Sequence, residues 1–385
     1  MNVEINTKNK YKNGECIVME RKYSKELLNK LVERQETIMI KGAEVLVKNL
    51  PDSDEKGAMD PRLYKDMKSQ LLMMKYMPKS LMKMDTSPKG IEKLRKMFNG
   101  VKSIPIVKKN IEIEHRNVKG EDGNQIPVRI YKSETMRKNP QILYFIHGGG
   151  FFGGSPDVVE EFVKIIVEKT DILAVSVDYR LAPENPYPAG HKDCYSTLKW
   201  IYKNAENLGG DKNNIFVAGD SAGGNLTQYC TTRDMEDKLG MVKGQLLLYP
   251  TVNMAGIEDE YFKWSIDEYE MSPKHKSGIT MMLDMFGSMV ELGDILGTTE
   301  IDNDYLTPYK RNPKGLPPTF MTVGEHDFLK VESLAYIAKL ANSGVETKTV
   351  LYKGFGHAYA DNVGVYPQSE DCAIEIGKFI LEISK

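Results

Sequence analysis

Cysteine is scarce in this chain of 385 residues. The four cysteines, Cys16, Cys194, Cys230 and Cys372, are widely separated and form no Cys-x-x-Cys pair. A disulfide framework needs closely spaced cysteines, and a zinc–thiolate site usually needs such pairs. We therefore expect these residues to pack in the interior, and we expect no bound metal.

Long apolar runs are also absent. No run approaches the roughly 18 to 20 residues that a membrane span needs, and the polar first residues, MNVEINTKNKYKNGEC, lack the apolar segment of a secretory signal. These absences predict a soluble, cytoplasmic protein without integral membrane association. A formal net charge of −2 gives no global attraction to nucleic acid or anionic lipid. The expected partner is therefore a small molecule, and the sequence leaves a homo-oligomer open.

What is present is an alternation of strand and helix patterns. Short apolar stretches between residues 110 and 250 are separated by helical ones at 157–169 and 194–205, which are long enough to cross over a parallel sheet. The later apolar stretches are nearly continuous, as expected for strands that are covered on both faces. Further helices are expected at 330–341 and 371–383. The fold class is α/β, a mostly parallel central sheet flanked by helices, with strands expected over 111–115, 126–131, 141–147, 172–179, 214–220, 245–250, 318–324 and 347–353.

The remaining zones have helical patterns. Apolar residues recur at helical spacing from about Ser24 to Leu50, which predicts an amphipathic helix, and methionine-rich helical stretches lie from about Asp60 to Met84 and at 277–296. Methionine fills irregular apolar gaps, so these helices either pack on the core or form a flexible wall over an apolar substrate. The expected division is a helical extension or cap at 1–109, the core at 110–250 and 307–385, and a helical cap insertion at 251–306.

The chemistry is concentrated where strands end. Gly219-Asp220-Ser221-Ala222-Gly223 is a G-x-S-x-G sequence directly after an apolar strand and before a helical stretch. So sharp a strand-to-helix turn strains the central serine, and the flanking glycines remove side chains that would collide. Ser221 is then presented at a helix N-terminus as a nucleophile, and the Ala222 N–H points at developing negative charge.

A second glycine-rich turn, HGGG at 147–150, follows the strand at 141–147. The main-chain N–H groups of successive glycines approach a substrate closely because no side chains stand in the way. Two of the three residues Gly148, Gly149 and Gly150 could therefore complete an oxyanion hole with Ala222.

The same turn also fits a dinucleotide-binding pattern. Gly148, Gly150 and Gly153 give G-x-G-x-x-G after a strand and before a helix, and Asp178 ends the next strand. That alternative leaves the G-x-S-x-G turn and a later histidine without a role. We therefore favour the oxyanion-hole interpretation of this turn.

The later histidine is His357, which follows the last expected strand in the sequence GFGH. In a Ser, acid, His triad on this architecture the base comes last along the chain, so His357 lies where a group that titrates near neutral pH is needed. The acid should leave the preceding strand, which offers Glu325 and Asp327. Side-chain alternation does not separate two acids that are two residues apart, so the residues alone leave this choice open.

Three motifs, taken in order, resemble those of the hormone-sensitive-lipase-like family of α/β-hydrolases: HGGG at 147–150, DYRLAPE at 178–184 and GDSAGGN at 219–225. The resemblance covers roughly residue 142 to the C-terminus. It implies an α/β-hydrolase fold with a helical cap, ester hydrolysis without a cofactor, and Asp327 as the acid. It also implies oxyanion donors chiefly at Gly149, Gly150 and Ala222.

The sequence departs from the family pattern at two places. Phe328-Leu329 follows the acid where the family commonly has Pro-Leu, and Ala358-Tyr359 follows His357 where it commonly has Gly-Phe. These changes leave the triad intact and affect the substrate pocket.

The expected function is that of a serine esterase, which hydrolyses carboxylic esters of short to medium acyl chains through Ser221, His357 and Asp327. The expected partner is a small-molecule ester. Amide or carbamate cleavage uses the same residues and stays an alternative. A ligand-binding protein without catalysis and a dinucleotide-dependent oxidoreductase are alternatives from other classes, because fold alone does not fix function.

Overall fold

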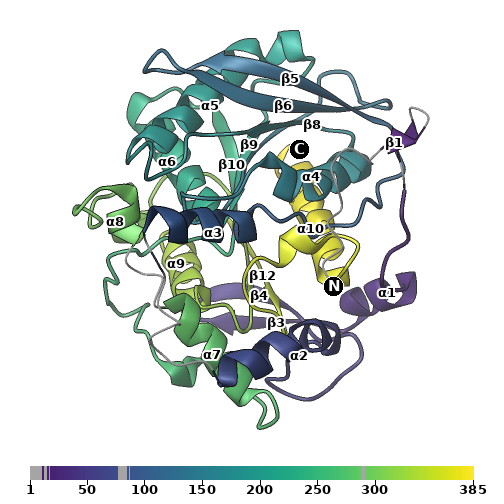
Figure 1. The fold of residues 1–385 in the computed structure, drawn as a ribbon. Helices are drawn as coiled ribbons and strands as arrows, with labels where there is room; N and C mark the ends of the chain where they lie inside the picture. The colour runs from purple at the N-terminus through teal and green to yellow at the C-terminus, as the bar shows by residue number, and fades with distance from the viewer. Residues whose placement is uncertain (1–10, 13–14, 17, 77–84, 86, 288–291) are drawn as a thin grey trace.

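Figure 1 shows the computed structural model, which describes residues 11–12, 15–16, 18–76, 85, 87–287 and 292–385. The strands are β1 (Tyr11–Lys12), β2 (Glu15–Cys16), β3 (Gln35–Ile40), β4 (Ala43–Lys48), β5 (Ile111–Lys119), β6 (Gln125–Ser133), β7 (Ile142–Ile146), β8 (Leu173–Val177), β9 (Ile215–Asp220), β10 (Val242–Leu248), β11 (Thr319–Gly324) and β12 (Thr347–Tyr352). The helices are α1 (Lys25–Glu33), α2 (Pro61–Lys75), α3 (Pro88–Phe98), α4 (Pro156–Thr170), α5 (Ala189–Leu208), α6 (Ala222–Asp237), α7 (Lys276–Gly287), α8 (Leu292–Leu296), α9 (Lys330–Asn342) and α10 (Pro367–Ile383).

A ten-stranded mixed sheet forms the centre of the molecule, in the order β3-β4-β12-β11-β10-β9-β7-β8-β6-β5. The strands from β4 to β8 in this order run parallel to one another. At the two edges β3, β6 and β5 pair antiparallel. The predicted strands from β5 to β12 and the predicted helices α4, α5, α9 and α10 are all present, so the expected α/β class is confirmed.

Helices cover both faces of this sheet (Figure 1). In β7, Leu143 and Phe145 belong to an apolar cluster with side chains of α4 and α10, whereas Tyr144 and Ile146 belong to one with side chains of α5 and α6. Because alternate residues of a strand point to opposite faces, both sets must be apolar, which explains the continuous apolar runs in the sequence. As predicted for packing residues, three cysteines are buried and free: Cys194, Cys230 and Cys372. The side chain of Cys16 lies outside the described residues.

The predicted helix from Ser24 to Leu50 is wrong over most of its length. Helix α1 starts at the N-cap Ser24, whose Oγ accepts the Leu27 N–H at 3.2 Å, and it ends at Glu33. The chain then forms the hairpin of β3 and β4. At its turn Lys41 and Gly42 have φ values of 48° and 88°, the left-handed pair that two-residue hairpin turns favour.

The second strand of this hairpin belongs to the core sheet. Strand β4 pairs in parallel with β12, and its β-branched residues Val45 and Val47 are buried. At the end of the strand the buried Lys48 ammonium lies 3.3 Å from Asp371 and 3.2 Å from Glu375 of α10. Tertiary pairing with β12 therefore overrides the helical spacing of the apolar residues.

Outside the sheet, helices α2 and α7 pack against each other (Figure 1). Leu71 of α2 belongs to the same apolar cluster as Ile279 and Met282 of α7. The methionine-rich helix predicted from Asp60 to Met84 is thus present as the shorter α2, and Met77, Met82 and Met84 lie outside the described residues. Helix α3 was not predicted. The division into core and cap stays a prediction.

Of the helices in the described ranges, none has the length and apolarity to cross a lipid bilayer. The described part of the chain also contains no cluster of three or more His, Cys, Asp or Glu side chains that could hold a metal ion.

Candidate active site

Ser221 lies at the turn between β9 and α6, at the N-cap of that helix. Its backbone has φ 54° and ψ −117°, a strained conformation that a non-glycine residue adopts only where its surroundings enforce it. The flanking residues must be glycine, because a Cβ on Gly219 would lie 2.2 Å from the carbonyl oxygen of Gly223. The sharp strand-to-helix turn predicted at Ser221 is therefore confirmed.

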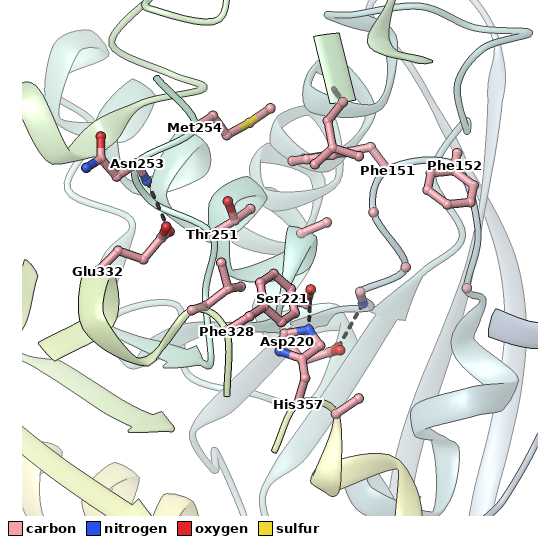
Figure 2. Close-up of a pocket in the computed structure, with 18 of the residues that line it drawn as sticks. Phe151, Phe152, Asp220, Ser221, Thr251, Asn253, Met254, Phe328, Glu332 and His357 are labelled. Carbon is pink, nitrogen blue, oxygen red and sulfur yellow. Dashed lines mark hydrogen bonds between the residues drawn. The ribbon is translucent and has the colours of Figure 1, made fainter. Parts of the chain in front are cut away.

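His357 and Asp327 reach Ser221 from the ends of neighbouring strands, β12 and β11. His357 Nε2 lies 2.9 Å from Ser221 Oγ (Figure 2), and His357 Nδ1 lies 3.0 and 2.9 Å from the two carboxylate oxygens of Asp327. An ionised carboxylate only accepts hydrogen bonds, so the Nδ1–H donates to Asp327. The Nε2 of the neutral ring is then left to accept the Ser221 O–H.

Asp327 is fully buried, and it has a second donor besides the imidazole. The N–H of Leu329 donates to its Oδ1 at 2.9 Å. This bond fixes the rotation of the carboxylate, so that Oδ2 is held against His357.

Glu325, the other acid that the sequence offered, faces away from the imidazole of His357. Its Oε1 accepts the Lys353 ammonium at 2.6 Å, and its Oε2 accepts the Gly354 N–H at 2.9 Å. The side chain therefore ties the end of β11 to the segment that leads to His357. The structure brings Asp327, and not Glu325, to the histidine.

The glycine-rich turn after β7 faces Ser221 across a cavity. The Gly148 N–H donates to Asp220 Oδ1 at 2.8 Å (Figure 2), so the prediction that Gly148 belongs to the oxyanion hole is wrong: its N–H already has an acceptor. The N–H groups of Gly149, Gly150 and Ala222 have no hydrogen-bond acceptor among the described residues, and all three residues line the cavity. These three N–H groups remain available to a ligand.

Two carboxyl groups beside this turn are held away from water. Burial raises the pKa of Asp220 well above its usual value, and the nearby Asp361 carboxylate raises that pKa further. Burial also raises the pKa of Asp361 to about 6, against the lowering effect of the Lys102 charge.

Burial lowers the pKa of His147 to about 4, and its ring stacks on Tyr179 at 4.4 Å. His147 is therefore a neutral packing residue at neutral pH.

Ser221, His357, Asp220, Asp361 and the glycine-rich turn border one cavity of about 730 Å³. Its walls combine the loops at the strand ends with residues from outside the sheet, such as Phe98 of α3 and Leu283 of α7. The Phe98 ring packs edge-on against Phe152 of the glycine-rich turn, with 5.4 Å between ring centres. The aromatic rings that line the cavity are Phe98, Phe151, Phe152, Phe262, Trp264 and Phe328.

Glu332 of α9 also lines the cavity, and sequence reasoning gave it no role. Its Oε1 accepts the N–H groups of Val252 at 2.7 Å and Asn253 at 3.2 Å, and Figure 2 shows the bond from Asn253. Burial raises the pKa of Glu332 to about 7, although the two N–H donors lower it. This carboxyl therefore holds the start of the 251–306 segment in place. Asp361 was missed in the same way, because neither residue belongs to a motif.

The sequence profile of the family described as an α/β hydrolase fold matches residues 143–361, more than half of the chain. The chain belongs to the α/β-hydrolase family. The carboxylesterase NlhH of Mycobacterium tuberculosis is 33% identical, over 74% of this chain and 87% of the relative. The arylesterase of Saccharolobus solfataricus is 28% identical, over 71% and 84%. The hyperthermophilic esterase of Pyrobaculum calidifontis matches in structure with a TM-score of 0.64 at 26% identity, covering 85% of this chain and 99% of the other.

This result confirms the family resemblance seen in the three motifs and the α/β-hydrolase fold that it implied. The bond from Gly148 to Asp220 holds the glycine-rich turn against the nucleophile turn. Chemically, the site holds a hydroxyl that is hydrogen-bonded to an imidazole, and the imidazole is oriented by a buried carboxylate.

Proposed function

We propose that this hydrolase is a serine carboxylesterase that cleaves carboxylic esters through an acyl-enzyme on Ser221. The observation that carries the proposal is the hydrogen-bonded series of the buried Asp327, His357 and Ser221, of which His357 and Ser221 line the cavity. The relatives support it, because they carry the names carboxylesterase and arylesterase.

In the proposed mechanism, His357 Nε2 takes the proton of Ser221 as Oγ attacks the carbonyl carbon of the ester. The carbonyl oxygen becomes negative and accepts hydrogen bonds from the N–H groups of Gly149, Gly150 and Ala222. His357 then protonates the leaving alcohol. A water that His357 deprotonates attacks the acyl-enzyme, and His357 passes this proton to the departing Ser221 Oγ as the acid is released; Asp327 stays hydrogen-bonded to Nδ1 throughout.

The proposal extends to the substrate and to the division of the chain. A cavity of about 730 Å³ with mostly apolar walls suits short to medium acyl chains. We assign residues 110–250 and 307–385 to the core together with the β3–β4 hairpin, and 251–306 together with helices α2 and α3 to a cap that excludes water from the reaction. The contributions of Phe98 and Leu283 to the cavity wall support this assignment.

The test uses aryl esters of graded acyl length and the matching anilides. Ser221→Ala should lower kcat by about 10⁶, the order of magnitude seen on removal of a catalytic serine in a comparable triad. A serine-directed phosphonate should label Ser221 and inactivate the wild-type protein. Ser343→Ala, at the end of α9, is the control and should leave turnover unchanged. Substantial ester turnover by folded Ser221→Ala would refute the proposal, and faster cleavage of the anilides would move the activity to amides.

A further inference from the structure

Apart from the histidines, the titratable side chains on the wall of the cavity at Ser221 are all acids. The acids Asp220, Glu258, Asp284, Glu332 and Asp361 line it, and no lysine or arginine of the described residues does. A cleft with walls of low polarity and charges of one sign focuses its field and raises the local concentration of the opposite charge. Its field therefore favours a cationic ligand and opposes an anionic one.

Two of these acids, Glu258 and Asp284, are exposed to solvent, so they lie at the mouth of the cavity. Within the described part of the chain neither makes a hydrogen bond or an ion pair. Their surroundings do not lack cations, because Asp259, next to Glu258, lies 3.1 Å from the Lys339 ammonium. Asp259, which does not line the cavity, therefore has a cationic partner, whereas Glu258 and Asp284, which do line it, have none among the described residues.

Trp264 is the third exposed group on the cavity wall. Its side chain is 53% exposed, which is unusual for so large an apolar ring, and it lines the same cavity. Among the aromatic rings, indole attracts a cation most strongly, through the negative face of its π system. An indole ring on the wall of the same cavity as two free carboxylates suits an ammonium group better than a neutral or an anionic one.

Farther inside, the cavity offers an acceptor that the protein does not use. Asp361 lines the cavity, and its Oδ1 is buried and has no hydrogen-bond partner among the described residues. Buried polar atoms are normally paired, so this acceptor is open to a donor from the cavity, either water or a group of a bound ligand. Lys102 acts electrostatically on Asp361, but it does not line the cavity.

We propose that the ester substrate of this enzyme carries an ammonium group, bound at the cavity mouth by Trp264, Glu258 and Asp284 while its carbonyl carbon reaches Ser221. This inference rests on the proposed esterase function. It adds the charge class of the substrate to that function.

The expected preference follows from the type of contact. An exposed cation–π contact and two exposed ion pairs each contribute a few-fold, and together they give roughly a ten-fold advantage in kcat/KM. The advantage should shrink as salt rises, because exposed charges are screened over about 10 Å at 0.1 M ionic strength.

The experiment compares esters that differ only in charge. One pair is a choline ester and the 3,3-dimethylbutyl ester of the same acid, which replaces nitrogen by carbon. A second pair carries the same exchange at the end of the acyl chain. We expect the ratio of kcat/KM, cationic over neutral, to be roughly ten in at least one pair at low salt and to fall towards one at high salt.

The variants Glu258→Gln, Asp284→Asn and Trp264→Leu should each lower this ratio by a few-fold. Glu260→Gln, two residues from Glu258 on the same segment but not on the cavity wall, is the matched control and should keep the ratio. A ratio at or below one in both pairs, with the neutral esters still turned over, would overturn this inference and leave the esterase function standing. If the wild-type protein hydrolyses none of the four esters, the proposed function itself fails.

Discussion

The substitution Asp327→Asn tests the site most sharply, because the structure predicts which way the new amide will turn. The N–H of Leu329 donates to Asp327 Oδ1 at 2.9 Å, and an asparagine would keep its oxygen at that donor. Its NH₂ group would then take the place of Oδ2, 2.9 Å from His357 Nδ1. The amide nitrogen can donate to Nδ1, so the ring with its proton on Nε2 competes with the native tautomer, in which the Nδ1–H donates to the retained oxygen 3.0 Å away.

A protonated Nε2 faces Ser221 as a donor and cannot take its proton. The same loss of tautomer in a well-studied Ser-His-Asp triad lowers kcat by about 10⁴. We expect a loss of that order here, measured on an aryl ester near neutral pH, with circular dichroism showing that the fold is kept. Glu325→Gln is the control, because its carboxylate binds Lys353 and Gly354 and not the imidazole, so it should keep most of the turnover. A loss below ten-fold for Asp327→Asn would refute the assigned tautomer and the role of Asp327.

Three further substitutions test the surroundings of the site. The pKa of Glu332 is about 7 in the folded protein against an ordinary 4.5, so its ionisation destabilises the fold as pH rises from 4.5 to 7. Glu332→Gln should therefore have a higher melting temperature than wild type at pH 8, equivalent to at most about 3 kcal/mol in the free energy of unfolding, and the same melting temperature at pH 4. Gly149→Ala should abolish ester turnover, because φ is 116° and the new Cβ would lie 2.2 Å from the Gly153 oxygen; unchanged kcat would exclude this turn from catalysis. Lys48→Met leaves Asp371 and Glu375 buried without their ammonium and should destabilise the protein by about 3 kcal/mol in urea unfolding, whereas an unchanged midpoint would show that the hairpin is not tied to α10.

The parts of the site that the sequence predicted are those with local causes. The turn at Ser221 needs glycine at fixed offsets within a few residues, so the motif alone describes its geometry. The hydrogen bond from Gly148 to Asp220 joins residues that are 72 positions apart, and its formation depends on how two loops meet. No pattern in either loop states that the Gly148 N–H is already in use. Glu332 and Asp361 are single acids without a motif, and only their burial reveals them.

The error in the N-terminal part has a different origin. Strand β3 is exposed along nearly its whole length, so it shows no alternation of apolar and polar residues that could indicate a strand. Its turn is Lys-Gly, whereas the hairpin signal that can be recognised in a sequence is Asn-Gly or Asp-Gly. The apolar residues of β4 happen to continue the helical spacing of the apolar residues in α1, so the two segments together resembled one helix. The partner that makes β4 a strand, β12, lies at the other end of the chain.

The pairing of β4 with β12 also affects how the protein folds during its synthesis. The contacts that hold β4 in the sheet join residues as far apart as Lys48 and Asp371, which are separated by 323 positions. During synthesis, the segment that becomes β4 leaves the ribosome long before β12 exists, so it waits without its parallel partner while most of the core is translated. Such long-range pairing closes late and slows folding. Over that interval the apolar stretch of β4 is an unpaired strand edge, the kind of surface on which chaperones act and from which aggregation begins.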